Sequence, residues 1–180
     1  MAKAAKRARQ TAAITAAMER TLRRVSSLAI ALMRADAAYE KGAEAMSAAT
    51  ARGISDDQAV AELLGCTNRV ENNDLTRASG LLALHLASIY AVAEKWRVWQ
   101  FADPEVDPLL DSPHLAVLEE FRHGVFHIDP FDAASLTNLA TRREVIEWSR
   151  QLASAFRKAL RAWSTDPRGR MTEHLLRVGP

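Results

Sequence analysis

The ten residues from Leu118 to His127 contain the side chains of this chain that are best suited to chemistry. Arg122, His123 and His127 lie there beside two glutamates and an apolar stripe. Histidine can accept or donate a proton near neutral pH, and arginine stays charged and can hold a phosphoryl oxygen through two donors. These groups would let an RNA 2′-hydroxyl attack its adjacent phosphate. The stretch therefore predicts acid–base chemistry on a phosphodiester, without a metal or a Ser or Cys nucleophile.

The spacing of the two outer groups limits how they can act together. Arg122 and His127 are five residues apart, so on a regular helix their side chains point about 140° apart. One helix therefore does not aim both groups at the same small target. Either Gly124 lets the helix loosen and end near His127, or a second copy of the protein supplies the other group. Asp129-Pro130 favours an end, because proline disfavours helical geometry in the residue before it.

Two other interpretations of the stretch are open. Glu119, His123 and His127 are spaced i, i+4, i+8 and share a helical face, which is a pattern that can bind zinc, nickel or copper. That spacing also recurs by chance in many helices. In a purely structural interpretation, Arg122 pairs with Glu119 three residues earlier, and the histidines cap backbone carbonyls.

The elements that must position this stretch are predicted to be helices. The 180 residues are 48% apolar, with 7 Gly and 6 Pro, and lack long runs of strand-type alternation. Apolar residues recur at threes and fours in four segments. These segments run from residue 2 to about 49, from Asn73 to about Gln100, from Ser112 to about His127, and from Thr141 to about Trp163. The first stripe includes Ile14, Met18, Leu22, Val25, Leu28 and Leu32, and the motif stripe includes Leu118, Phe121 and Val125.

This pattern predicts one all-α domain over residues 1–180, a bundle of four to five main helices with a long N-terminal helix. Residues 1–10 are expected to be a frayed basic extension, and residues 165–180 a basic C-terminal tail. Ser55-Asp56-Asp57-Gln58 has the form of a capping box and should start a short helix that ends near Leu64.

Charge is segregated along the chain although the net charge is only +2. Residues 1–34 contain 8 Lys and Arg against one acid, and residues 142–180 contain 9 against 4. The middle, residues 35–141, has a net charge of −10. The basic ends could bind phosphate backbones, with the N-terminal helix binding nucleic acid in its own right. They could equally pair with the acidic middle, within the chain or across a dimer.

Cysteine content and hydropathy point to a cytoplasmic protein without membrane association. The single cysteine, Cys66, cannot form an internal disulfide, which fits a reducing compartment. The longest apolar run, from Leu81 to Ala93, is shorter than the ~20 residues that cross a bilayer. The basic N-terminus lacks the apolar core and cleavage site of a secretory signal.

The residues from Phe121 to His127 resemble the signature of the HEPN superfamily. That signature is an arginine, a polar residue that is commonly Asn, His or Asp, about three further residues, and a histidine. Arg122, His123 and His127 match these positions, with His123 where Asn is the commoner choice. The preceding context, a helix ending in Tyr90 to Trp96 and an acidic Asp-Pro loop, also looks like a group of small bacterial HEPN-like proteins. The resemblance covers roughly residues 73–163.

The resemblance implies a HEPN-like bundle that forms a homodimer with the motif helices facing each other, so that the facing helix can complete the site. It implies a metal-independent endoribonuclease without a cofactor, in a toxin–antitoxin or phage-defence setting that would include a cognate antitoxin. His127 would act as general base or acid, Arg122 would hold the phosphate, and His123 would orient one of them. The products would be a 2′,3′-cyclic phosphate and a 5′-hydroxyl. The alternative is a catalytically silent HEPN-like module that only dimerises or binds a partner.

Overall fold

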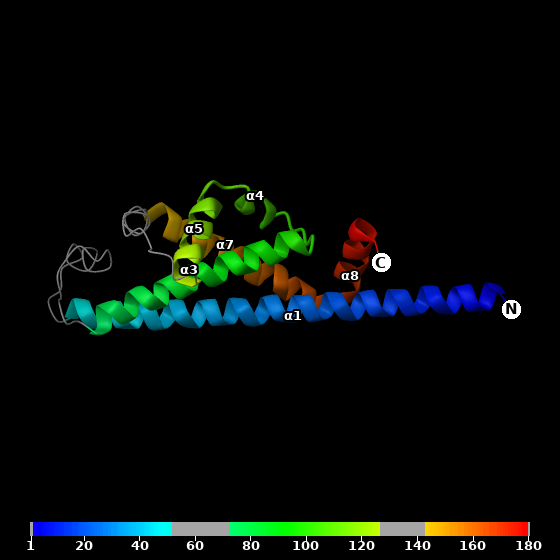
Figure 1. Ribbon diagram of the computed structural model, residues 1–180, viewed down its shortest axis with the longest axis horizontal. Coiled ribbons are helices and arrows are strands. Elements are labelled where there is room, and N and C mark those ends of the chain that lie inside the picture. Colours follow the sequence, from blue (N-terminus) through cyan, green and yellow to red (C-terminus); the bar gives the residue numbers. More distant parts are fainter. Residues whose placement is uncertain (1, 52–72, 127–142, 180) are drawn as a thin grey trace.

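The computed structural model describes residues 2–51, 73–126 and 143–179 (Figure 1). All elements in these ranges are helices, which confirms the predicted all-α bundle with a long N-terminal helix. They are α1 (Ala2–Ala51), α3 (Asn73–Val98), α4 (Asp107–Leu110), α5 (His114–Phe126), α7 (Arg143–Thr165) and α8 (Pro167–Val178). None of the helices in the described ranges is long and apolar enough to span a membrane. The predicted helix near residues 55–64, Cys66 and His127 lie outside these ranges.

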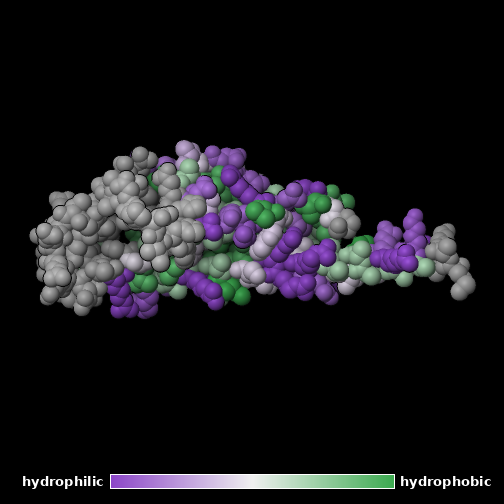
Figure 2. All heavy atoms as spheres, viewed as in Figure 1, coloured by the Kyte–Doolittle hydropathy of each residue, from purple (hydrophilic) through white to green (hydrophobic). Residues whose placement is uncertain are grey.

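The long helix α1 forms the base of the bundle, and α3 returns antiparallel along its C-terminal half (Figure 1). Leu28 and Leu32 of the predicted stripe are buried, whereas Ile14, Met18 and Leu22 remain 39%, 37% and 44% exposed. Ala17 and Thr21, in the same turns, are 4% and 3% exposed, so α1 turns a neighbouring face to the bundle there. The helix is also longer than its partner, because 50 residues make a helix of about 75 Å and 26 residues one of about 39 Å. The N-terminal part of α1 therefore projects beyond the other helices, with green and purple residues exposed along it (Figure 2).

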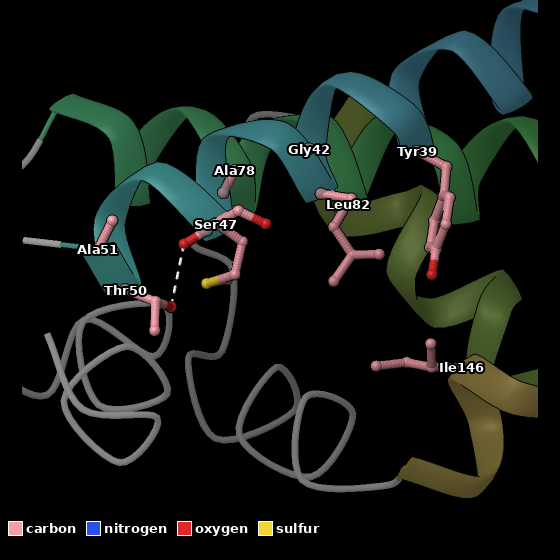
Figure 3. A pocket seen from close by; sticks show the side chains of 10 residues that line it. Tyr39, Gly42, Ser47, Thr50, Ala51, Ala78, Leu82 and Ile146 are labelled. Carbon is pink, nitrogen blue, oxygen red and sulfur yellow. Dashed lines mark hydrogen bonds between the residues drawn. The ribbon is translucent and has the colours of Figure 1, made fainter.

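Small residues let α1 and α3 approach closely. Gly42 of α1 faces α3, and a Cβ added to it would lie 3.3 Å from Leu81 Cβ and 3.4 Å from the Ala78 carbonyl oxygen. Figure 3 shows Gly42 and Ala78 at this crossing. Gly80 of α3 differs, because a Cβ there would have no neighbour within 4 Å. Both glycines have the same low helix propensity, but only Gly42 lies where a side chain would meet the neighbouring helix.

Substitution of these glycines should change stability in opposite directions. Gly80→Ala is expected to raise the free energy of unfolding by about 0.5–1 kcal/mol, because alanine favours the helix and meets no clash. Gly42→Leu is expected to lower it by about 1–3 kcal/mol, because the side chain must be forced between packed backbones. Urea unfolding followed by circular dichroism would measure both. A Gly42→Leu protein as stable as the parent would show that α1 and α3 are not closely packed at this point.

The apolar face of α7 closes the bundle over α3. The apolar residues that form this face are buried: Val145, Trp148, Leu152, Phe156, Leu160 and Trp163. Trp96 of α3 lies at the centre of the aromatic contacts, with its ring 5.2 Å from Phe101 and 5.4 Å from Phe156 between centroids. Trp96, which is 1% exposed, is therefore a core-packing residue.

The C-terminal residues form a helix, α8, where the sequence predicted only a basic tail. The Asp166 carboxylate accepts the Gly169 backbone N–H at 2.9 Å and so caps the helix, with Pro167 at its first position. Met171 and His174, three residues apart, are buried against the bundle. The helix α7 ends at Thr165, Asp166 is the N-cap of α8, and α8 begins at Pro167.

Two buried histidines make stability depend on pH. Burial lowers the pKa of His85 and of His174, because it disfavours the charged imidazolium. In the unfolded chain histidine has a pKa of about 6.5, so below that pH the unfolded state binds more protons than the folded state. The stability that these histidines contribute is complete above that pH and is lost as the pH falls below it.

We therefore expect the free energy of unfolding to be lower at about pH 5.5 than at about pH 7.5. The His85→Gln and His174→Gln variants should each lose part of this pH dependence. Urea titrations at the two pH values would measure the difference. The same pH dependence in both variants as in the parent would show that other groups cause it.

Candidate functional site

Arg122 is the predicted site residue whose side chain the structure places. It extends from α5 towards α3, where its Nη1 lies 3.6 Å from a carboxylate oxygen of Glu94. Its guanidinium carbon lies 5.5 Å from the centre of the Tyr90 ring, which is a cation–π distance. The Arg122 side chain is 35% exposed and that of Glu94 31%. A guanidinium group is thus held at a half-buried position between two helices, with part of it still open to solvent.

Tyr90 and Glu119 complete the group of side chains around Arg122. The Glu119 carboxylate of α5 lies near enough to the Tyr90 hydroxyl to affect its pKa. Burial raises the pKa of Tyr90, and Glu119 and Glu94 raise it further, so the phenol stays protonated. Tyr90 and Glu94 are spaced i, i+4 on α3, and Glu119 and Arg122 i, i+3 on α5. Each helix therefore presents two polar groups on the face that it turns to the other. We call Tyr90, Glu94, Glu119 and Arg122 the Arg122 cluster.

The start of α5 is fixed by its cap and by α3. The Ser112 hydroxyl oxygen accepts the His114 backbone N–H at 3.3 Å, as predicted for a cap that precedes Pro113. Arg97 of α3 donates to the Leu110 carbonyl oxygen and lies 3.5 Å from the Asp111 carboxylate. These contacts set the direction in which the helix leaves the connection.

Buried leucines then hold α5 against the bundle. Leu115 and Leu118 are 9% and 0% exposed, and Arg122 follows Leu118 by four residues, about one turn further on. Burial of this face is therefore what brings the Arg122 guanidinium to α3.

The two histidines of the motif are placed less fully. His123 belongs to α5 by its backbone, and its side chain lies outside the described part, as does all of His127. The angle between Arg122 and His127 thus stays a prediction. The alternative metal site needs both histidines with Glu119, so it also stays a prediction. Within the described residues, no group of three His, Cys, Asp or Glu side chains could hold a metal ion.

The partner that sequence reasoning missed is Glu94. The structural interpretation expected Arg122 to pair with Glu119, yet the ion pair of the Arg122 cluster is with Glu94. The sequence did single out Tyr90 to Trp96 as the context of the motif. The signal in the sequence was the i, i+4 spacing of Tyr90 and Glu94 on the helix that precedes α5. It could not show that this pair faces Arg122.

A cavity of about 590 Å³ lies elsewhere, beside the crossing of α1 and α3 (Figure 3). Met46, Leu82 and Ile146 line it, together with the Tyr39 ring and the hydroxyl groups of Ser47 and Thr50. It is lined by none of the residues predicted to act in catalysis. Among the described residues, its lining offers no cation. The Arg122 cluster is therefore the better candidate for binding a phosphate, because it contains a guanidinium group that is partly open to solvent.

Comparison of the chain with family models, curated proteins and solved structures gave no match. The HEPN resemblance of residues 121–127 therefore depends on the motif itself and on its position at the end of a helix packed against α3.

Proposed function

We propose that the chain is a metal-independent endoribonuclease of the HEPN type that acts as a homodimer. The observation that supports this most is the Arg122 cluster: an arginine of the predicted motif is held by a carboxylate and an aromatic ring while part of it faces solvent. A guanidinium group that is oriented before the substrate arrives loses less conformational freedom on binding a phosphate.

In the proposed reaction, the RNA 2′-hydroxyl attacks the adjacent phosphorus. A histidine takes its proton as the new O–P bond forms. The bond from phosphorus to the 5′-oxygen then breaks, and the same histidine, now protonated, gives a proton to that oxygen. We assign the proton transfers to His127, the binding of the phosphoryl oxygens to Arg122, and the orientation of one of these groups to His123. Glu94 keeps the Arg122 guanidinium in place between substrates.

A catalytically silent dimerisation or binding module is the second candidate. It is favoured by the same ion pair, because Arg122 already has Glu94 at 3.6 Å and a phosphate must compete with that carboxylate. In this case the Arg122 cluster would only join α5 to α3. The toxin–antitoxin or phage-defence setting, with its cognate antitoxin, belongs to the first candidate.

The test is cleavage of a mixed, end-labelled RNA pool in EDTA by the parent and by His127→Ala. The ribonuclease proposal expects cleavage by the parent alone, with cyclic-phosphate ends on the 5′ fragments. No cleavage by the parent, or equal cleavage by both proteins, would favour the silent module.

Mixing two inactive variants would test the shared site. If Arg122 of one chain works with His127 of the other, a heterodimer of Arg122→Ala and His127→Ala contains one intact site. An equal mixture, after exchange of subunits, should regain about a quarter of the parent activity, because half of the dimers are mixed and each has one site of two. No recovery in a mixture that sediments as a dimer would place both groups on the same chain.

A further inference from the structure

A basic cavity of about 260 Å³ lies between α1, α8 and the C-terminal end of α3. Its polar lining comes from Arg20, Thr21 and Arg24 of α1, from Gln100 after α3, and from His174 of α8. None of the described residues that line it is acidic. The two basic ends of the chain therefore meet at one place, which their separation in the sequence did not predict.

The arginines of this cavity differ from the basic residues of α7 in their ion pairing. On α7, Arg157 and Lys158 pair with Asp36 and Glu105 at 2.7 Å and 2.8 Å, so part of the basic charge does pair with the acidic middle. Within the described ranges, no carboxylate lies within 4.0 Å of the cationic groups of Arg20, Arg24 or Arg177. Arg20 and Arg24 thus line a hollow to which the described residues supply no counter-charge.

An aromatic ring and a backbone carbonyl hold two arginines at the cavity in position. The Arg24 guanidinium lies over the Trp99 ring, with its carbon 5.5 Å from the ring centre. Arg177 donates to the Gln100 carbonyl oxygen at 3.4 Å. A planar guanidinium that is already fixed in this way is suited to an anion with several acceptor oxygens.

His174 supplies the second, independent observation. His174 is 2% exposed, and neither of its ring nitrogens has a hydrogen-bond partner among the residues that the structure describes. Its ring is stacked on Phe101 at 4.8 Å between centroids with an angle of 23°, so the imidazole cannot simply turn to solvent. Leaving a buried polar group without a partner destabilises a fold, so an acceptor or donor that reaches His174 would be favoured. Thr21, which also lines the cavity, is 3% exposed.

We infer that this cavity binds a phosphate group, either of a small phosphorylated molecule or of an RNA strand. The donors around it are two guanidinium groups, one hydroxyl and one imidazole N–H, and phosphate oxygens are acceptors. The second ring nitrogen of His174 can accept from a protonated phosphate oxygen or bind a proton itself as the anion enters. The cavity is distinct from the Arg122 cluster, because none of its described lining residues belongs to that cluster. The inference does not rest on ribonuclease activity.

The experiment is a titration of the full chain with inorganic phosphate, followed through the ¹⁵N resonances of the His174 ring and through thermal stability. We expect saturable binding that shifts these resonances. Arg24→Gln and Arg20→Gln should each weaken it by about tenfold or more, which equals about 1.4 kcal/mol. Arg23→Gln is the matched control, because Arg23 lies on the same helix with a side chain that is 69% exposed and paired with Glu19. It removes the same charge and should leave binding unchanged.

The source of the phosphate is tested by measuring the binding of two RNA oligonucleotides with the same sequence. One has a 5′-phosphate and the other a 5′-hydroxyl. Tighter binding of the phosphorylated strand identifies a terminal phosphate, equal binding of both an internal one, and binding of inorganic phosphate alone a small molecule. Absence of saturable binding to all three probes, or equal weakening in Arg23→Gln, would overturn the inference. Binding that persists in Arg122→Ala while RNA cleavage is lost would separate this site from the catalytic proposal.

Discussion

Arg122→Ala is expected to reduce the rate of RNA cleavage by about 10²–10³-fold, as when one preorganised donor to a developing negative charge is removed. The reason is that Arg122 would stabilise the phosphoryl oxygens as charge builds on them. Arg122→Lys should retain part of the rate, because an ammonium group keeps the charge and loses the two-donor fork. Initial rates on one defined oligonucleotide, at saturating and at low substrate, would separate an effect on chemistry from one on binding.

The bundle offers a matched control for this prediction. Arg150 of α7 lies 3.3 Å from Glu147 and 5.7 Å from the centre of the Tyr39 ring, so it has a carboxylate and an aromatic partner as Arg122 has. Arg150→Ala removes an equivalent cation at a position without the motif and should leave the rate unchanged. Equal losses in Arg122→Ala and Arg150→Ala would indicate a general effect of charge and would contradict a catalytic role.

Glu94 tests whether the ion pair positions Arg122 or competes with substrate. If Glu94 positions the guanidinium, Glu94→Gln should slow cleavage, and the double variant with Arg122→Ala should be no slower than Arg122→Ala alone. Faster cleavage by Glu94→Gln would show that the carboxylate competes with the phosphate. In the silent module, the same substitution should change stability only.

The sequence predicted most of the helices because their apolar residues follow one period for many turns. The predicted bounds of α3 and α7 differ from the observed ones by two residues at most. Periodicity reports which face is apolar and not which residues of that face another helix will cover. The stripe of α1 was therefore predicted in full, although Ile14, Met18 and Leu22 stay partly exposed while Ala17 and Thr21 beside them are buried. The helix α8 was missed because Asp166-Pro167 was interpreted only as a break.

The candidate site shows the same limit. Arg122 could be identified from a local motif, because the motif is contained in one helix. Its contact with Glu94 joins residues 28 positions apart, and it depends on how α5 is seated on α3. That seating is decided by Leu115, Leu118 and the Ser112 cap together, so neither helix alone specifies it. The basic cavity likewise needed the folding of α8 back onto α1, which no spacing along the chain indicates.

Trp96→Ala is expected to lower the free energy of unfolding by about 3–5 kcal/mol, the usual cost of truncating a fully buried aromatic side chain. The Trp96 side chain is 1% exposed and contacts Phe101 and Phe156, so its loss leaves a cavity where α3 meets α7. Its indole N–H also points to the Asp107 carboxylate at 3.4 Å, so the substitution removes a contact between α3 and α4. Chemical denaturation would measure the change.

Leu176→Ala is the matched control, because Leu176 is 83% exposed and its truncation should change stability by less than about 0.5 kcal/mol. Trp96→Phe separates the two contributions of the side chain, since it keeps most of the packing and removes the hydrogen bond to Asp107. If that bond helps to fix the connection before α5, Trp96→Phe should make α5 open more easily. Backbone amide exchange in α5 should then become faster by more than the loss of global stability explains. Equal stability of Trp96→Ala and Leu176→Ala would mean that the junction of α3 and α7 is not the centre of the core.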